Sequence, residues 1–253
     1  MKRLAKVVPV GLALIVLATT SAGAQAGRDG ALLKAAEAGD AARIQELLAS
    51  GADINTRDEH GRTPLMIAAV KGHAPAVTLL LDKGSDIAAK NKYGLSALQF
   101  AAGTGRAEVV GVLLERGANP RERDARTGDV PVISAAGSGS VDTVAALLAR
   151  GADVNEKNRT GSTALMRATM NGRSEMVLFL LKNGADGTAK DEKGNKALGT
   201  LGAPRCISLD GAGALKEHGA YEPAEIQRAL FNTVIGPASC TEVVKFLVES
   251  APT

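Results

Sequence analysis

The sequence predicts an all-α solenoid, a linear stack of six to seven helix–turn–helix units with short β-hairpin fingers between them. The first observation behind this prediction is a glycine-led motif that recurs in steps of 33, 33, 34 and 33 residues from Gly51 to Gly184. The second is that aromatic residues make up only 2% of the chain, so aliphatic side chains must form the core. A fixed period of this length is typical of stacked supersecondary units and not of a globule with one cleft.

The first helix of each unit is predicted from a segment that begins with a cap or a proline. Thr63 and Thr163 are suited to accept a backbone N–H as N-caps. Pro64 and Pro131 occupy the first helical turn, where no N–H donor is needed. Pairs of small residues follow and let neighbouring helices approach closely; these are Ala68-Ala69, Ala101-Ala102, Ala135-Ala136 and Ala168-Thr169.

The second helix of each unit is predicted from an apolar run that ends in paired leucines, at Leu80-Leu81, Leu113-Leu114, Leu147-Leu148 and Leu180-Leu181. A glycine follows each run and is suited to a left-handed C-terminal cap; these are Gly51, Gly84, Gly117, Gly151 and Gly184. Turn signatures at residues 58–61, 91–94, 158–161 and 191–194 predict the fingers between units. The fourth unit holds one extra residue within residues 119–129.

These motifs together resemble the ankyrin repeat, and the resemblance covers residues 30 to 190 well. The resemblance implies an array over residues 27–253, with units at 30–55, 56–88, 89–121, 122–155, 156–188, a degenerate unit at 189–220 and a C-terminal cap at 221–253. Other residues replace the histidine that in this family ties neighbouring loops together; they are Met66, Gln99, Ile133, Met166 and Gly199. Part of the family's polar network between repeats is therefore expected to be absent.

The N-terminus reads as a signal peptide over residues 1–26. Three basic residues precede an apolar run, and small residues around Ala22, Ala24 and Ala26 supply cleavage sites, so the mature chain is expected to start at Gln25 or Gly27. The alternative is an uncleaved anchor, although the run is shorter than the about 20 residues that a membrane span needs. Without this segment, 27 basic residues face 27 acidic ones, so the basic balance of the full chain is no argument for nucleic-acid binding.

The two cysteines of the chain, Cys206 and Cys240, lie in its degenerate C-terminal part. Export to an oxidising compartment permits a disulfide between them, which we expect to staple the last units. The alternative is a pair of buried thiols, because equivalent positions of adjacent units lie beyond the usual reach of a bridge.

No set of residues in the sequence predicts catalysis, a cofactor or a metal site. The chain has three histidines, and His73 falls in the turn between two helices of one unit, where a structural role is expected. Neither cysteine lies in a C-x-x-C motif. Asn158-Arg159-Thr160 matches a glycosylation sequon, a pattern that is common by chance. We therefore interpret the chain as a binding protein and not as an enzyme.

The resemblance implies a partner protein on the concave face, which we define as the finger tips and the exposed side of the first helices. By position, the expected contact residues are Glu59, His60, Arg62, Lys71, Lys92, Tyr93, Arg121, Arg123, Arg126, Arg159, Met170 and Asn171. The leading hypothesis is an exported bacterial monomer, periplasmic or secreted, that binds and regulates or protects a periplasmic protein. The alternatives are a secreted factor that binds host proteins and a stress-defence accessory that uses its thiols.

Overall fold

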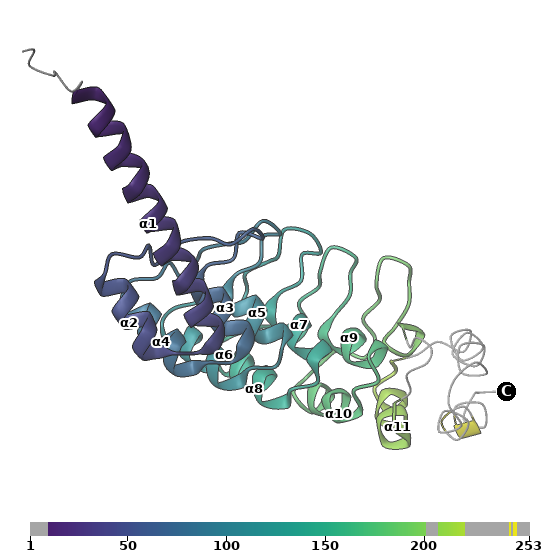
Figure 1. The fold of residues 1–253 in the computed structure, drawn as a ribbon. Helices are drawn as coiled ribbons and strands as arrows, with labels where there is room; N and C mark the ends of the chain where they lie inside the picture. The colour runs from purple at the N-terminus through teal and green to yellow at the C-terminus, as the bar shows by residue number, and fades with distance from the viewer. Residues whose placement is uncertain (1–9, 201–206, 221–242, 244, 247–253) are drawn as a thin grey trace, which may run out of the picture.

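A computed structural model describes residues 10–200, 207–220, 243 and 245–246, with side chains from residue 23 onward. The chain forms paired helices in regular succession (Figure 1). These are α1 (Val10–Ala38), α2 (Ala41–Ala49), α3 (Pro64–Lys71), α4 (Ala74–Asp82), α5 (Ala97–Gly103), α6 (Ala107–Glu115), α7 (Pro131–Ser138), α8 (Val141–Ala149), α9 (Ala164–Met170), α10 (Ser174–Lys182), the 3-10 helix η1 (Leu198–Thr200) and α11 (Leu209–Glu217). The prediction of an all-α repeat array is confirmed.

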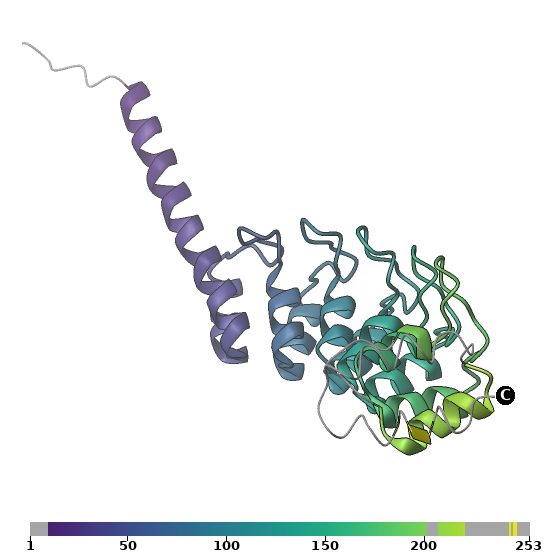
Figure 2. The ribbon, with the colours of Figure 1, turned by 90° about the vertical axis from the view of Figure 1, so that its right-hand side faces the viewer.

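The helices form two layers that run along the array. An inner layer contains the end of α1 followed by α3, α5, α7, α9 and η1, each in contact with the next. An outer layer contains α2, α4, α6, α8, α10 and α11, and the fingers extend from the inner layer along one side (Figures 1 and 2). The core between the layers is aliphatic, with fully buried side chains such as Leu65, Leu80, Leu98 and Leu113.

Local sequence signals explain where the inner helices begin. The hydroxyl oxygens of Thr63 and Thr163 accept the backbone N–H of Met66 and Met166 at 3.4 and 3.3 Å, as the capping prediction requires. The five glycines predicted to follow the outer helices all have positive φ between 83 and 92°, which satisfies the last carbonyls of each helix. The expected β-hairpins are wrong: no residue in the described ranges is in a strand. Each finger is closed by too few bonds to make a ladder, such as Asp58 N–H to the carbonyl of Arg62.

A row of cations joins the fingers, and the sequence analysis missed it. We call it the cation ladder: Arg57, Lys90, Arg123 and Lys157 each donate to a backbone carbonyl of the next unit. The acceptors are the carbonyls of Lys90, Arg123, Lys157 and Lys190, at 2.7, 3.2, 2.8 and 2.9 Å. Since the contacts repeat at the period of the sequence, they fix the register between neighbouring units. A basic residue before each Asp or Asn turn is the signal that could have revealed the ladder.

The replacements at the family's histidine positions lose only part of the network between repeats. Met66, Ile133 and Met166 are buried and apolar. Gln99 is different, because its side chain forms a capping box with Ser96 and donates to the carbonyl of Asp129 in the next unit at 3.2 Å. One polar connection between repeats is therefore kept by an amide in place of an imidazole.

The two ends of the array depart from the regular unit. At the N-terminal end α1 is one continuous helix, whose last turns pack as the first inner helix (Figure 2). In the sixth unit, a short 3-10 helix takes the place of the inner α-helix, in accord with the predicted degeneration around Gly199. The predicted disulfide between Cys206 and Cys240 and most of the predicted C-terminal cap fall outside the described residues.

Candidate functional site: the concave face

The fourth finger carries the extra residue of its unit at the tip. Two residues separate the turn-forming Asp or Asn from the glycine in the other fingers, whereas three residues, 125–127, separate Asp124 from Gly128. The closing bond accordingly spans one more residue, from the N–H of Asp124 to the carbonyl of Asp129. The insertion therefore lengthens the finger at the concave face and leaves the helices on either side unchanged.

Asp124 holds the longer turn together. Its carboxylate accepts the backbone N–H groups of Arg126 and Thr127 at 2.7 Å and that of Asp129 at 2.8 Å. The hydroxyl of Thr127 also donates to this carboxylate. Every oxygen of Asp124 is thus engaged within the finger, and the side chain is buried.

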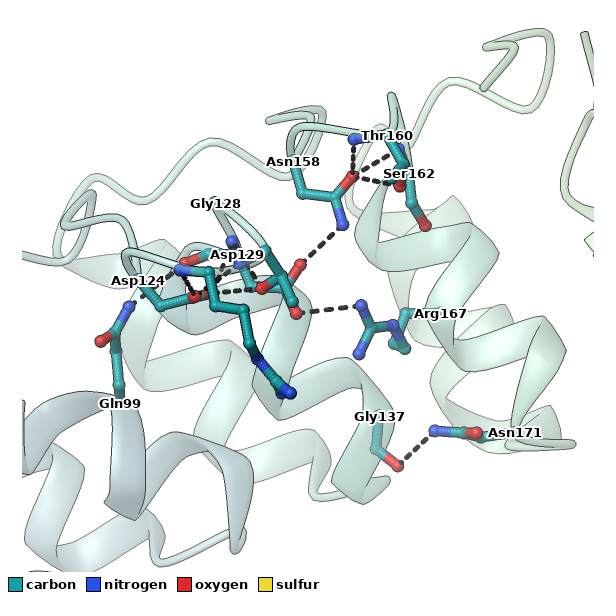
Figure 3. A network of polar contacts seen from close by, with 12 residues as sticks. Gln99, Asp124, Gly128, Asp129, Gly137, Asn158, Thr160, Ser162, Arg167 and Asn171 are labelled. Atoms are coloured by element: carbon teal, nitrogen blue, oxygen red, sulfur yellow. Dashed lines mark hydrogen bonds and ion pairs between the residues drawn. The ribbon is translucent and has the colours of Figure 1, made fainter. Parts of the chain in front are cut away.

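Asp129 connects three units at the base of the same finger (Figure 3). Its two oxygens accept from Asn158 Nδ2 at 2.7 Å and Arg167 Nη2 at 2.9 Å. Its backbone carbonyl accepts from Gln99, as described above. The side chains of Asp129 and Arg167 are only 9% and 25% exposed, so this ion pair lies largely out of water. Both oxygens of Asp129 are satisfied, which favours a structural role for this carboxylate, whereas Arg167 Nε is buried without a hydrogen-bond partner among the described residues.

Several predicted contact residues serve the scaffold. Arg121 donates to the carbonyl of Gly151 at 3.0 Å. Arg123 donates to two carbonyls and pairs with Glu156 of the next unit. Arg159 donates to the carbonyls of residues 125 and 126 in the preceding finger, at 2.6 and 3.1 Å. Asn171 donates to the carbonyl of Gly137 at 3.0 Å. These side chains are therefore held in place by the array itself.

Other predicted contact residues form ion pairs at the edge of the concave face. Arg62 pairs with Asp58 in its own finger at 2.7 Å. Lys71 pairs with Glu37 of the preceding unit at 3.0 Å. The ring of His60 lies 3.4 Å from the carboxylate of Glu59. The Lys71–Glu37 and His60–Glu59 contacts are exposed and contribute little to stability, whereas the side chain of Asp58 is only 15% exposed.

Four predicted residues present side chains that the array does not use. Tyr93 and Met170 are 56% and 41% exposed, which is unusual for large apolar side chains. Lys92 and Arg126 are exposed and have no ion pair among the described residues. These four lie on the third, fourth and fifth units, which makes the centre of the array the best candidate contact region.

Two hollows lie on this part of the concave face. The larger, which we call the central groove, has a volume of about 500 Å³ and lies between the third and fourth fingers, over α5 and α7. Tyr93, Leu95, Phe100 and Arg126 line it together with Arg167 of α9. The smaller hollow, of about 340 Å³, lies beside Met170 in the fifth and sixth units. The sequence analysis anticipated residues of both hollows but not the hollows themselves.

Burial and hydrogen bonds shift the pKa of several finger carboxyls. Burial alone raises the pKa of Asp58, Asp124 and Asp191, but the N–H and O–H groups that donate to each carboxylate outweigh it and hold the pKa below its ordinary value. Glu122 is the opposite case, since burial raises its pKa despite the hydroxyl of Ser96 and the ammonium of Lys90. The second, fourth and sixth fingers are thus built on ionised aspartates that accept hydrogen bonds within the turn.

The described residues contain no group of three or more metal-ligating side chains. The ring of His73 lies 3.0 Å from the carbonyl of Glu37, a contact between units that accounts for this histidine. The amide of the sequon residue Asn158 donates to Asp129 and its oxygen accepts from Thr160 and Ser162, so the amide is committed to the finger.

The comparisons with known proteins bear on this repeat architecture. The family described as "Ankyrin repeats (3 copies)" matches residues 32–124 and 121–191. None of the curated proteins matches the chain. Within the part of the chain that the structure describes, no helix has both the length and the apolar character to cross a membrane. The matched residues span most of the array described above, and the chain belongs to the ankyrin repeat family, whose members are non-catalytic modules for protein–protein interaction.

Proposed function

We propose that the chain is an exported interaction module whose concave face binds one protein outside the cytoplasm and regulates or protects it. The observation that carries the proposal is that some exposed side chains make contacts within the array and others do not. Contacts between units occupy the side chains of Arg121, Arg123 and Arg159. Tyr93 and Arg126 remain available beside a groove, and such residues are enriched at the energetic centre of protein interfaces.

The export part of the proposal depends on the N-terminal sequence. The basic residues, the apolar run and the small residues before Gln25 support a signal peptide. The side chain of Gln25 donates to Asp29 at 2.8 Å and to the carbonyl of Gly51 at 3.1 Å, so it helps to tie α1 to the start of the array. Cleavage after Ala24 keeps these contacts, whereas cleavage after Ala26 removes them. The intact mass of the exported protein distinguishes the two, and a full-length mass in the membrane fraction contradicts the proposal.

A capture experiment tests the binding part of the proposal. The mature chain is immobilised and exposed to periplasmic extract, and retained proteins are identified by mass spectrometry. We expect one protein to be retained by the parent chain and lost with Tyr93→Ala. Leu178→Ala is the matched control, because Leu178 is 39% exposed but lies on the outer helix α10. Equal retention by the two variants would contradict binding at the concave face.

Two other roles remain as alternatives. A secreted factor for host proteins would use the same concave face, so only the identity of the captured protein separates it from the leading proposal. A stress-defence accessory would instead depend on the thiols of Cys206 and Cys240. Thiol titration of the oxidised, denatured protein tests this, because an intramolecular disulfide leaves no reactive thiol.

A further inference from the structure

We propose that the central groove receives an acidic segment of the partner, in which a carboxylate lies next to an apolar side chain. This inference rests on the proposed function and adds the chemical class of the segment that is bound. Three features of the groove carry it: its shape, its apolar wall and the sign of its available charge.

The shape of the groove follows from small residues on the inner helices. Where the second unit has Ile67 and Val70, the fourth unit has Ser134 and Gly137. Gly103 of α5 occupies the corresponding position of the third unit and is exposed at the groove. The surface is therefore hollowed over α5 and α7.

The wall of the groove provides apolar surface for one side chain of the partner. Tyr93 of the third finger lines the hollow and is largely exposed, and Leu95 and Phe100, which also line it, are only partly buried. Partners that bury an aliphatic or aromatic side chain here remove the exposed ring of Tyr93 from water. Tyrosine contributes large contact area with few rotatable bonds, which makes it an effective anchor.

The lining of the groove holds two aspartates and two arginines, and the charge among them that remains available to a ligand is the positive one of Arg126. Two aspartates, Asp124 and Asp129, line the groove, but donors of the array already occupy both oxygens of each carboxylate. Arg126 also lines it and pairs with no carboxylate among the described residues. A guanidinium in this state favours a partner carboxylate, with which it makes two parallel hydrogen bonds.

The neighbouring finger tips increase the positive potential. Lys92 stands beside Tyr93 on the third finger. Arg159 of the fifth finger donates to carbonyls of the fourth finger, and no carboxylate neutralises its charge among the residues described. Like charges across an interface are costly, so a basic segment is disfavoured in this groove. The same cations speed the approach of an acidic one.

The test uses random dodecapeptides displayed on phage and selected on the immobilised mature chain. Enriched peptides are synthesised with a fluorophore, and their dissociation constants are measured by fluorescence anisotropy. We expect the enriched sequences to contain Asp or Glu next to an aliphatic or aromatic residue. We also expect binding to weaken as salt is raised, because the contact includes exposed charges.

A pair of glycine variants tests the place of binding. A Cβ at Gly103 meets only the Cβ of Ser134, at 3.9 Å, so Gly103→Leu fills the groove without displacing the backbone. Gly111 on the outer helix α6 has no atom within 4 Å of its Cβ, which makes Gly111→Leu the matched control. We expect Gly103→Leu to weaken binding by about tenfold or more and Gly111→Leu by less than about twofold.

A pair of charge variants tests the sign. Arg126→Glu reverses the charge in the groove, and Lys182→Glu makes the same change at an exposed position of the outer helix α10. We expect the first to weaken acidic peptides by about tenfold or more and the second by less than about twofold. Melting temperatures verify that all four variants are folded.

The outcomes separate this inference from the proposed function. Enrichment of basic or uncharged peptides, no enrichment at all, or equal binding by Gly103→Leu and Gly111→Leu would overturn the acidic-segment proposal. If the capture experiment still yields a protein whose retention needs Tyr93, the concave-face proposal stands while this one fails. If acidic peptides bind through Arg126 but no protein is retained in a way that needs Tyr93, the acidic-segment proposal stands and the concave-face proposal fails.

Discussion

The fourth and fifth fingers occupy equivalent positions in their units, but different side chains close their turns. In the fifth finger, the side chain of Asn158 closes a regular turn by accepting the N–H groups of Thr160 and Ser162. In the fourth finger the turn is one residue longer, and the carboxylate of Asp124 accepts three N–H groups and a hydroxyl. An amide has one acceptor oxygen and a carboxylate has two, so Asp124 accepts from more donors than Asn158 does, although Asp58 and Asp191 lead fingers of regular length.

The residue at the base of each finger differs as well. Ser162 in the fifth finger is partly buried, and its N–H completes the regular turn. The equivalent Asp129 in the fourth finger binds Asn158 and Arg167 of the next unit. The longer finger is thus tied to its neighbour by an ion pair, while Arg126 at its tip is left without one. The comparison shows how a finger with one inserted residue exposes a charged side chain while its base stays tied to the scaffold.

The largest effect is expected from removing the ion pair at the base of the fourth finger. Asp129→Ala leaves Arg167 and Asn158 without acceptors in a largely buried setting. We expect the free energy of unfolding to fall by about 2–3 kcal/mol, measured by urea denaturation. The control is Asp142→Ala, an exposed position in the first turn of α8, where the loss is expected to stay below about 1 kcal/mol. Similar losses in both variants would mean that the pair does not hold the finger.

Acid is expected to weaken the fingers together. The pKa values of Asp58, Asp124 and Asp191 are held below the ordinary 3.8 in the folded chain, so folding favours the ionised forms. Their contribution to stability is present above pH 3.8 and is lost as the pH falls through the folded pKa values. Urea denaturation between pH 6 and pH 3 measures this, at about unit steps of pH. We expect Asp124→Asn to show a weaker loss than the parent chain.

Glu122 is expected to change stability with pH in the direction opposite to the three aspartates. Its pKa is raised above the ordinary 4.5 by burial, so the folded chain favours the protonated form. Its contribution to stability is present below pH 4.5 and is lost as the pH rises through the folded pKa. Glu122→Gln is therefore expected to lessen the fall in stability above pH 4.5. An unchanged profile in that range would contradict the assignment.

A smaller effect on stability is expected from substituting, one at a time, the two arginines of the fourth finger, one of which contacts the scaffold while the other is exposed. Arg123 belongs to the cation ladder and also pairs with Glu156, whereas Arg126 has no such contacts. We expect Arg123→Ala to lower the unfolding free energy by about 1 kcal/mol and Arg126→Ala by less than about 0.5 kcal/mol. Thermal melts of the two variants in one buffer make the comparison. Equal losses in the two variants would show that Arg123 does not stabilise the array more than Arg126 does.

Much of the fold could be predicted because its determinants are local and repeat. The caps at Thr63 and Thr163 and the positive-φ glycines after the outer helices follow from single residues in fixed register. The β-hairpin expectation failed because strand assignment needs a ladder, and the fingers have room for only one or two closing bonds. Periodicity reports which units repeat but not how many bonds a short turn contains.

The candidate site was harder to predict, since exposure depends on contacts between units. Tyr93, Met170 and Arg126 are as exposed as their positions suggested. Arg121 and Arg123 have the same charge and lie in the same segment, yet each donates to a carbonyl of the following unit, that of Gly151 and that of Lys157 respectively. Sequence position alone cannot separate these arginines, because the acceptors are backbone groups that every residue carries. The central groove was missed for a related reason: it arises from small residues in two different units.

The smallest effect on stability is expected from deleting Thr127, which returns the fourth finger to the regular length. Shortening an exposed turn by one residue changes its closure entropy little, and the deletion leaves Asp124 and Asp129 in place while removing the two hydrogen bonds that Thr127 donates to the Asp124 carboxylate. The carbonyl of Arg126 would then occupy the position from which Thr127 now accepts the N–H of Arg159. We expect the melting temperature to change by less than about 4 °C, the shift that about 1 kcal/mol produces. The dissociation constant of an acidic peptide is expected to change far more, by about tenfold, because Arg126 moves relative to Tyr93. Unchanged peptide binding after the deletion would mean that the inserted residue does not set the reach of Arg126, and that the two fingers differ in length alone.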